Sequence, residues 1–332
     1  MSHIAVFGAG SWGTAFATIL ADAGNDVRIW GRRQEVVDQI NAGCNEDYLP
    51  DTRLPEGISA STDPAEVVAD TDVVVLSVPS QSLRDNLTEW GSLLTDDQVV
   101  VSLMKGIELG TTRRMSEVIA EVAHIRTDRI AVVSGPNLAR EIVQRQPAAT
   151  VVACPDHASA EKVAAACSTD YFRPYTSTDI VGAEIAGAVK NVIALAVGMA
   201  EGLGLGDNTK ATLITRGLAE TTRLGVALGA DPRTLAGLSG VGDLIATCMS
   251  PLSRNHSFGV ALGQGMSITE LQARKRQTAE GVKSCASILE LARAHDVYVP
   301  IIESVTAAVH EGQSVQDIIR RLSSRAPKPE TD

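Results

Sequence analysis

A glycine-rich segment, Gly8-Ala9-Gly10-Ser11-Trp12-Gly13, directly follows an apolar run at residues 3–8. The pattern G-x-G-x-x-G between a strand and a helix is the fingerprint of a dinucleotide site. In this pattern Gly8 permits the tight turn, Gly10 lets the backbone approach the pyrophosphate, and Gly13 lets the helix pack closely on the strand. The N–H groups at the start of the helix then face the phosphates. The segment therefore predicts a dinucleotide-binding βαβ unit, and a glycine-rich turn that binds nothing remains the alternative.

Short apolar runs rich in Val and Ile alternate with helical patterns through the first part of the chain. Near-continuous apolarity in such runs is typical of strands covered on both faces. Alternation of strands and helices predicts a doubly wound, Rossmann-like parallel sheet. We therefore expect a dinucleotide-binding domain at residues 1–178, with strands at residues 3–8, 26–30, 72–78, 98–103, 130–134 and 150–154.

Helical patterns alone continue after residue 178 and predict a separate all-α domain at residues 179–325, followed by a flexible tail at 326–332. The apolar stretch 185–200 is interrupted by Lys190 and Asn191 and is shorter than the roughly 20 residues that a membrane span needs, so a buried helix is expected there. The expected helices are 179–200, 208–228, 231–237, 241–248, 284–294, 301–311 and 315–321.

Composition limits the partners that this chain can have. A net charge of -11 argues against a nucleic-acid partner, because nucleic acid needs a basic face. The five cysteines form no CxxC pair and no zinc spacing, so no metal site is expected. An odd number of thiols fits a reducing compartment, and the N-terminus has no signal-peptide pattern, so we expect a cytoplasmic protein.

The end of the second expected strand, at Trp30, indicates which dinucleotide binds. NAD sites place an acidic residue at this position, on the ribose hydroxyls. Here the strand is followed by Gly31, Arg32 and Arg33. Guanidinium groups match a 2′-phosphate in geometry and charge. The pattern predicts that NADP(H) is preferred and that NAD(H) is also used; a solvated basic turn is the alternative.

Lys190 is the strongest candidate for chemistry, because it lies in the middle of an apolar helix. An unpaired buried ammonium is costly, so the group must be paired, neutral or facing a polar cavity. Such a lysine is a candidate proton donor with a lowered pKa, and Asn191 beside it could orient substrate. Asp243 and Thr247 lie one turn apart on a later helix and could hold the lysine. A purely structural buried ion pair is the alternative.

Three further segments carry polar groups that suit the same cleft. Lys105 follows the expected strand 98–103, and Gly135-Pro136-Asn137 follows the strand 130–134. Ligands of doubly wound sheets lie outside the carboxyl ends of the strands, so both segments are expected to face the cleft. Ser253, Arg254 and Asn255 place a hydroxyl, a guanidinium and an amide in one short loop, a combination that fits a phosphate or a carboxylate. Ordinary loop residues are the alternative for each segment.

Taken together, these motifs resemble the bacterial NAD(P)-dependent glycerol-3-phosphate dehydrogenases over nearly the whole chain. The resemblance rests on several long motifs in the family's order. They are GAGSWGTA at 8–15, VPS at 78–80, KGIE at 105–108, SGPNLAREI at 134–142, AGAVKNVIALAVG at 186–198, GDNTKATLITRGLAE at 206–220, GLSGVGDLIATC at 237–248, SRN at 253–255 and AEGV at 279–282.

The resemblance implies a reduction of dihydroxyacetone phosphate to sn-glycerol 3-phosphate, used in phospholipid synthesis, by a homodimer. It implies that Lys190 is the catalytic acid/base and that Asp243, Lys105, Asn191 and Thr247 complete the catalytic cluster. The implied substrate contacts are Lys105, Gly135, Asn137, Lys190, Asp243, Ser253, Arg254 and Asn255. With the glycines of the first motif, the expected cofactor contacts are Gly8, Gly10, Ser11, Trp12, Gly13, Arg32, Arg33, Lys105, Ala139, Arg254, Thr278 and Glu280.

The chain departs from the family pattern at two positions. Asn137 stands where the family usually has Ser, and His256 stands where the family often has Arg. Two other functions remain open on the residues alone: a dehydrogenase of the same architecture acting on a hydroxy acid or ketopantoate, and a non-enzymatic dinucleotide sensor. A buried lysine beside a matched acid argues against the sensor, which needs no proton donor.

Overall fold

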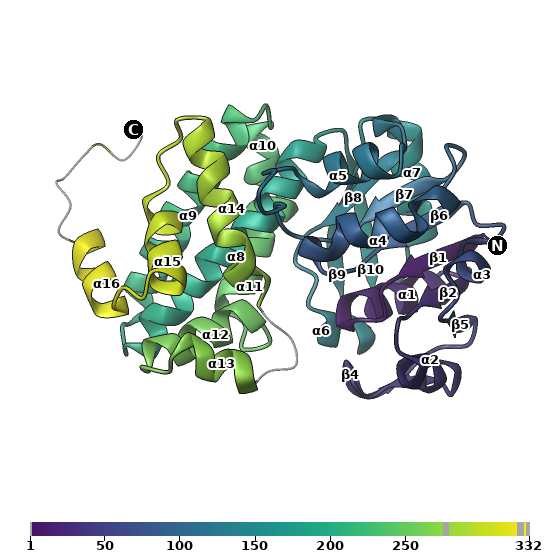
Figure 1. The fold of residues 1–332 in the computed structure, drawn as a ribbon, viewed down its shortest axis with the longest axis horizontal. Helices are drawn as coiled ribbons and strands as arrows, with labels where there is room; N and C mark the ends of the chain where they lie inside the picture. The colour runs from purple at the N-terminus through teal and green to yellow at the C-terminus, as the bar shows by residue number, and fades with distance from the viewer. Residues whose placement is uncertain (1, 275–278, 324–328, 330–332) are drawn as a thin grey trace.

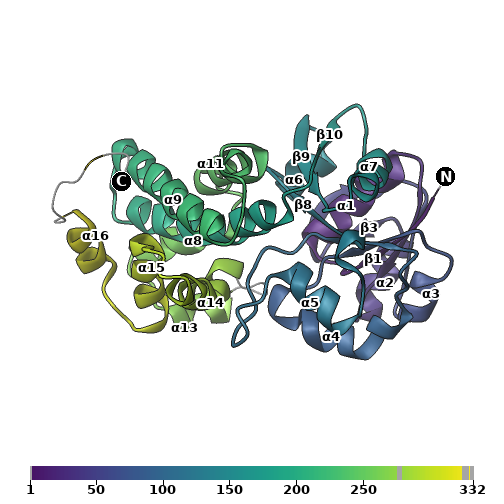
Figure 2. The same ribbon diagram turned by 90° about the horizontal axis from the view of Figure 1, so that it is seen from above.

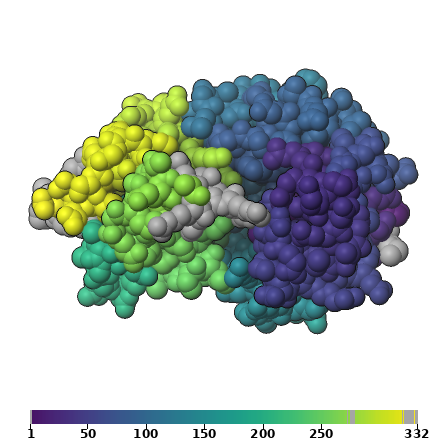
Figure 3. All heavy atoms as spheres, turned by 60° about the horizontal axis from the view of Figure 1, so that its bottom comes forward, coloured from purple at the N-terminus to yellow at the C-terminus, as the bar shows by residue number. Residues whose placement is uncertain are grey.

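The computed structural model describes residues 2–274, 279–323 and 329. The protein consists of a half built on a β-sheet and a helical half, which lie side by side (Figures 1 and 2). A space-filling view shows N-terminal segments, in purple, facing segments of the helical half, in green, across the boundary between the halves (Figure 3). The expected fold class is confirmed.

The first half contains an eight-stranded sheet with the order β10-β9-β8-β7-β6-β1-β2-β5. Every neighbouring pair is parallel except β8 and β9, which are antiparallel. The apolar runs mark a buried strand but not its direction, so the sequence did not predict this reversal. The strands are β1 (His3–Phe7), β2 (Asp26–Trp30), β5 (Ile58–Ser61), β6 (Val73–Leu76), β7 (Val99–Ser102), β8 (Ile130–Ser134), β9 (Ala148–Ala153) and β10 (Phe172–Ser177).

All six expected strands are present, but the sequence analysis missed β5, β10 and the hairpin β3 (Cys44–Asn45)/β4 (Leu49–Arg53). The missed strands β5 and β10 are the two edges of the sheet, and their residues are mostly half-buried or exposed. Edge strands are not covered on all sides, so they lack the continuous apolarity on which the prediction depended.

Helices cover both faces of this sheet. In β1, Ile4 and Val6 face one apolar layer, whereas Ala5 and Phe7 face the other, because successive side chains of a strand alternate. The first layer contains α1 (Ser11–Asp22), α2 (Gln34–Asn41), α6 (Ala139–Val143) and α7 (His157–Ala166). The second contains α3 (Pro64–Val68), α4 (Leu83–Trp90) and α5 (Met115–Val122).

The helical half is built around α8 (Ile180–Gly202), which is buried over most of its length. Among the described residues, α8 is the one unbroken helix with the length and composition of a membrane span, and the segments Pro232–Met249 and Arg254–Gly263 pass the same test only together, across a bend of 48°. However, 89% of the apolar window of α8 is buried inside the protein, as in the core helix of a folded domain. The other elements of this half are α9 (Asp207–Ala227), α10 (Pro232–Leu235), the π-helical turn η4 (Leu238–Gly242), α11 (Asp243–Met249), α12 (Arg254–Gly263), α13 (Ile268–Arg274), α14 (Glu280–Ala294), α15 (Pro300–His310) and α16 (Val315–Ser323).

Glycines bring α8 and α12 into backbone contact. A Cβ atom on Gly198 of α8 would lie 2.2 Å from the carbonyl oxygen of His256, and a Cβ on Gly259 of α12 would lie 2.3 Å from that of Leu195. Real Cβ atoms do not approach that closely, so side chains at these positions would separate the helices.

The expected loop at 253–255 is wrong after its first residue, because Ser253 is the N-cap of α12 and accepts a hydrogen bond from the backbone of His256. A serine before a helical pattern is a helix-start signal that the sequence analysis overlooked.

Candidate active site

The turn between β1 and α1 has the backbone that its three glycines predict. Gly8 has a φ of +126°, and a Cβ there would lie 2.5 Å from the carbonyl oxygen of Ser77. A Cβ on Gly13 would lie 2.1 Å from the carbonyl oxygen of Gly8. A Cβ on Gly10 would meet open space, and no side chain caps α1. The N-terminus of α1 is therefore open to an anion such as a pyrophosphate.

A hairpin that the sequence analysis missed supports this turn. Asn45 donates to the carbonyl oxygen of Ala9 at 3.0 Å and to the Thr14 hydroxyl at 2.8 Å. Ser11 donates to the carbonyl oxygen of Tyr48 at 2.9 Å. These contacts join residues that are 31 to 37 positions apart in sequence, so no local pattern predicts them. The hairpin thus fixes the expected phosphate turn from outside the sheet.

The two arginines after β2 are exposed, so their guanidinium groups are accessible to the 2′-phosphate of an NADP(H) molecule. Arg33 donates to the Asp47 carboxylate at 2.7 Å, and its guanidinium lies 5.6 Å from the centre of the Tyr48 ring. Arg32 lies next to it at the surface. The hairpin residues therefore orient one of the two guanidinium groups at the nucleotide end of the site. Trp12, in the same region, has a buried indole N–H without a hydrogen-bond partner among the described residues.

The reacting end of the site is a cluster of two ammonium groups on one buried carboxylate. Lys105 donates to Asp243 Oδ2 at 2.5 Å, and Lys190 donates to Asp243 Oδ1. Lys190 also donates to the Thr247 hydroxyl at 2.9 Å. Asp243 is 1% exposed and Lys190 is 7% exposed, so the cluster is largely withdrawn from solvent. The structure thus brings together four of the five expected catalytic residues.

Three elements deliver these side chains. Lys105 follows β7, Lys190 lies in the middle of α8, and Asp243 and Thr247 lie one turn apart on α11. Gly187 of α8 packs against this region, because a Cβ there would lie 3.1 Å from Ser134 Oγ and in ordinary contact, at 3.5 Å, with Lys105 Cγ. Lys105 also donates to the carbonyl oxygen of Gly135, at the carboxyl end of β8, at 3.4 Å. The cluster therefore lies at the carboxyl ends of β7 and β8, the edge at which a doubly wound sheet binds its ligands.

Burial and charge set the protonation of the cluster. Burial lowers the pKa of Lys190 to about 7; repulsion from Lys105 acts in the same direction and attraction to Asp243 opposes it. Burial alone would raise the pKa of Asp243, but the ammonium groups of Lys105 and Lys190 hold that pKa below its ordinary value. The carboxylate is therefore charged at neutral pH, whereas Lys190 can gain and lose a proton there. A group that titrates near neutrality is suited to general acid–base catalysis.

The expected phosphate residues lie at the start of α12, beside α8. Asn255 donates to Asn191 Oδ1 at 2.9 Å and accepts from the backbone N–H of Gly281 at 3.0 Å. Asn191 follows Lys190 in sequence, so this amide pair joins the start of α12 to the middle of α8. Ser253 caps α12, and Arg254 is exposed at its first turn.

The remaining expected contacts line the boundary between the two halves. Asn137 donates to the Thr150 hydroxyl at 2.8 Å, and its buried Oδ1 has no hydrogen-bond partner among the described residues. Ala139 begins α6. Glu280 begins α14 and accepts a hydrogen bond from Ser80, which follows β6, at 2.7 Å. Thr278 and most of the tail at 326–332 lie outside the described residues.

Comparison with known proteins finds similarity over almost the full chain. Residues 3–160 match the model for the N-terminus of NAD-dependent glycerol-3-phosphate dehydrogenase, and residues 179–320 match the model for its C-terminus. The chain is 62% identical to glycerol-3-phosphate dehydrogenase [NAD(P)+] of Streptomyces coelicolor over 98% of this chain and 97% of the relative. It is 58% identical to the enzyme of that name from Thermobifida fusca over 99% of both chains.

A crystal structure of glycerol-3-phosphate dehydrogenase from Coxiella burnetii has the same overall fold. It superposes with a TM-score of 0.93 at 35% sequence identity, over 98% of this chain and 99% of that one. A sequence identity of 35% over both halves shows that the two proteins are similar in sequence as well as in fold. This chain therefore belongs to the NAD-dependent glycerol-3-phosphate dehydrogenase family.

Proposed function

We propose that this protein catalyses the reversible NAD(P)H-dependent reduction of dihydroxyacetone phosphate to sn-glycerol 3-phosphate, which supplies phospholipid synthesis. The observation that carries the proposal is the pair of lysines on Asp243, at the carboxyl ends of the strands that follow the glycine turn. Curated relatives across the whole chain bear the name of this activity.

Lys190 is the general acid of the reduction in this proposal. A bound NAD(P)H would supply the hydride. Asp243 and Thr247 hold the Lys190 ammonium in place, and Lys190 donates a proton to the carbonyl oxygen of the substrate as negative charge develops there. Lys105 adds a second positive charge beside the same oxygen. In the reverse direction neutral Lys190 accepts the proton from the C2 hydroxyl.

The start of α12 anchors the substrate phosphate. Ser253, Arg254 and Asn255 combine a guanidinium with hydroxyl and amide donors at a helix N-terminus, which suits a phosphate. Asn255 is tied to Asn191 beside the general acid. Binding the phosphate there replaces a bimolecular encounter with a fixed geometry at the carbonyl group. Asn137 Oδ1, buried and without a partner among the described residues, is available to accept a hydrogen bond from a substrate hydroxyl.

The proposal includes a nucleotide domain at residues 1–178 and a catalytic domain at 179–325, divided between β10 and α8. It also includes a cytoplasmic location, which the five unpaired cysteines suit.

A homodimer is proposed because α11 exposes two large apolar residues. Ile245 is 48% exposed and Met249 is 52% exposed. Light scattering of the purified protein tests the oligomeric state.

A substrate comparison tests the function directly. Purified protein with NADPH should oxidise the cofactor when dihydroxyacetone phosphate is added, and far more slowly with ketopantoate or with 2-keto acids that lack a phosphate. Rapid turnover of a keto acid instead would assign the architecture to another dehydrogenase. Binding of NADPH without turnover of any ketone would favour a sensor.

The arginines after β2 should determine the preference for NADPH. Changing both Arg32 and Arg33 to Ser should raise KM for NADPH by about 10-fold or more, because bonds to charged groups contribute about 1.5–3 kcal/mol. KM for NADH should change much less, since NADH lacks the 2′-phosphate. Steady-state kinetics with each cofactor measure this, with Arg126→Ser, at the exposed N-cap of η3 (Thr127–Arg129), as the surface control. Equal effects on both cofactors would contradict the assignment.

The two directions of the reaction should depend on pH in opposite ways. Lys190 titrates at about 7, and the reduction needs its protonated form, so kcat/KM for the ketone should fall as pH rises through the neutral range. The oxidation needs neutral Lys190, so kcat/KM for glycerol 3-phosphate should rise over the same range. Initial rates in both directions across a pH series measure this. Two profiles that move in the same direction would exclude Lys190 as the titrating group.

A further inference from the structure

The segment that carries Lys105, residues 105–114, folds back on itself. Ile107 and Arg114 form an isolated antiparallel bridge, and the Glu108 backbone N–H donates to the carbonyl oxygen of Arg113 at 2.9 Å. The Thr111 hydroxyl donates to the Glu108 carboxylate. Such a closed loop moves as one unit, so whatever holds Ile107 and Glu108 also holds Lys105 at its base. We refer to residues 105–114 as the lysine loop.

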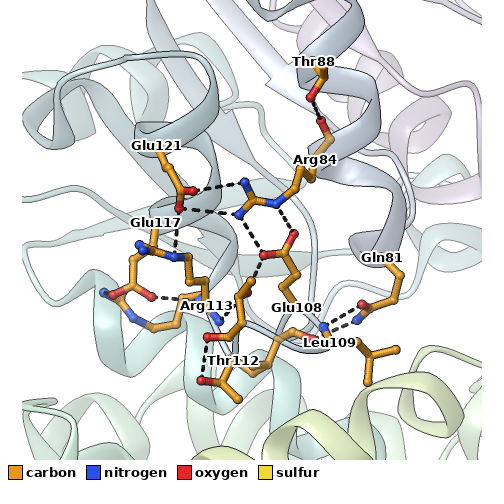
Figure 4. Close-up of polar contacts among 12 residues, drawn as sticks. Gln81, Arg84, Thr88, Glu108, Leu109, Thr112, Arg113, Glu117 and Glu121 are labelled. Carbon is orange, nitrogen blue, oxygen red and sulfur yellow. Dashed lines mark hydrogen bonds and ion pairs between the residues drawn. The ribbon is translucent and has the colours of Figure 1, made fainter.

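Gln81 holds the backbone of the lysine loop with both ends of its amide (Figure 4). Its Nε2 donates to the carbonyl oxygen of Ile107 at 2.8 Å, and its Oε1 accepts from the backbone N–H of Leu109 at 2.9 Å. The side chain thus pairs with the loop as a neighbouring strand would. Gln81 lies in η1 (Ser80–Ser82), which follows the central strand β6, so its two hydrogen bonds hold the loop near the carboxyl end of that strand.

Arg84 holds the side chain of Glu108 in the same region (Figure 4). Its Nε and one terminal nitrogen donate to the two carboxylate oxygens of Glu108, each at 2.9 Å. The other terminal nitrogen donates to Glu121 of α5 at 3.1 Å. Glu108 is 8% exposed, and its bonds from Arg84 and Thr111 outweigh burial and lower its pKa. A bidentate pair of this kind fixes orientation as well as distance.

The other side of the lysine loop contacts the helical half. Ser287 of α14 donates to the same carbonyl oxygen of Ile107 at 2.8 Å. Glu184 of α8, 5% exposed, accepts from Arg114 at 2.6 Å and from the backbone N–H of Ser116 at 2.8 Å. Gly106 has no room for a side chain, because a Cβ there would lie 2.6 Å from Ser80 Oγ. The loop is therefore held between η1 and α4 on one side and α8 and α14 on the other.

We propose that Gln81 and the Arg84–Glu108 pair are positioning residues for the reaction, which hold the lysine loop so that the Lys105 ammonium stays on Asp243. The inference rests on the proposed function, because it requires Lys105 to act at the substrate carbonyl. One residue separates Lys105 from Ile107, so a displacement of the Ile107 carbonyl carries the lysine with it. Displacements of about 1 Å in a catalytic group can lower a rate by about 10²-fold.

A change in Lys105 position should also alter the proton affinity of Lys190. Lys105 repels the Lys190 ammonium and shares its carboxylate partner, and both effects favour neutral Lys190. If the lysine loop loosens, Asp243 pairs with Lys190 alone and the pKa of Lys190 rises. The alkaline limb of the pH profile of kcat/KM for the reduction should then move to higher pH. Loss of fold stability alone would not move this limb.

Gln81→Met tests the proposal, since it keeps the length of the side chain and removes both hydrogen bonds. We expect kcat for the reduction to fall by about 10- to 100-fold, KM for NADPH to stay within about twofold, and the alkaline limb to shift upward. Gln313→Met, at an exposed glutamine between α15 and α16, is the matched control and should resemble the wild type. Unchanged kcat and pH profile in Gln81→Met, with the fold intact by circular dichroism, would overturn the proposal.

A double-mutant cycle with Lys105→Met identifies the path of the effect. If Gln81 acts through Lys105, adding Gln81→Met to Lys105→Met should lower kcat by less than about twofold further, because interacting residues are non-additive. Multiplied effects would assign Gln81 another role and refute the proposal. Glu108→Gln provides a second variant if Gln81→Met does not fold, and Asp128→Asn is its control, because Asp128 forms an exposed bidentate pair with Arg126.

The wild type distinguishes failure of this inference from failure of the proposed function. A wild type that does not reduce dihydroxyacetone phosphate refutes the function and this inference with it. An active wild type, an impaired Lys105→Met variant and a fully active Gln81→Met variant refute the positioning role alone.

Discussion

Replacing Lys190 with Met should lower kcat for the reduction by about 10²- to 10⁴-fold, the range that a positioned general acid contributes. Met has a similar length and suits the apolar surroundings in the middle of α8. Asp243 keeps Lys105 as a charged partner in this variant, so the fold should persist. NADPH binding should remain close to normal, because the glycine turn and the arginines after β2 are untouched. Single-turnover absorbance measurements separate the chemical step from cofactor binding.

Lys162→Met is the matched control for this variant. Lys162 lies on α7 and is exposed, with its ammonium 3.5 Å from Asp72. Its replacement should leave kcat unchanged. If Lys190→Met kept wild-type turnover, the proton would have to come from another group, and the mechanism proposed for this cluster would fail.

Replacing Asp243 with Asn should produce the largest loss of stability. The change keeps the shape of the side chain but leaves two ammonium groups beside a neutral amide, in a place that is almost closed to solvent. Removing one partner of a buried ion pair costs about 3–5 kcal/mol. The free energy of unfolding from urea titrations should fall by that order, and catalysis should be lost with it.

The loss in Asp243→Asn should depend on pH. Without the carboxylate, burial and repulsion from Lys105 lower the pKa of Lys190 still further below its value in the unfolded chain. Folding must then release a proton, so the stability lost is greatest at acid pH and is partly recovered as pH rises. Asp128→Asn, at an exposed aspartate on η3, should show neither effect. A pH-independent loss would mean that the lysines are not charged neighbours in solution.

Local patterns were enough to predict the parts of the site that depend on neighbours in sequence. The glycine turn was predictable because the positive φ of Gly8 and the contact of Gly13 with the Gly8 carbonyl both lie within one βα unit. Lys190 stood out because a charge in an apolar helix needs a partner, and Asp243 supplies one. The sequence could not show that Lys105 shares the same carboxylate, because that contact depends on how three separate elements pack.

Contacts between distant segments explain what the sequence analysis missed. The hairpin that carries Asn45 and Tyr48 is short and polar, so it resembles a loop in sequence. Gln81 and Glu108 belong to ordinary polar turns, and only the fold brings them together. Ser253 was a readable helix start, and its omission was an error of interpretation rather than a lack of signal.

The glycine contact between α8 and α12 has a consequence for substrate length. The proposed phosphate anchor lies at the start of α12 and the proposed proton donor in the middle of α8, and the helices touch through backbone atoms at Gly198 and Gly259. Backbone atoms have no rotamers, so thermal motion of side chains at this contact does not vary the spacing between the two helices. The distance between α8 and α12 is therefore fixed, and it can change only when a whole helix shifts.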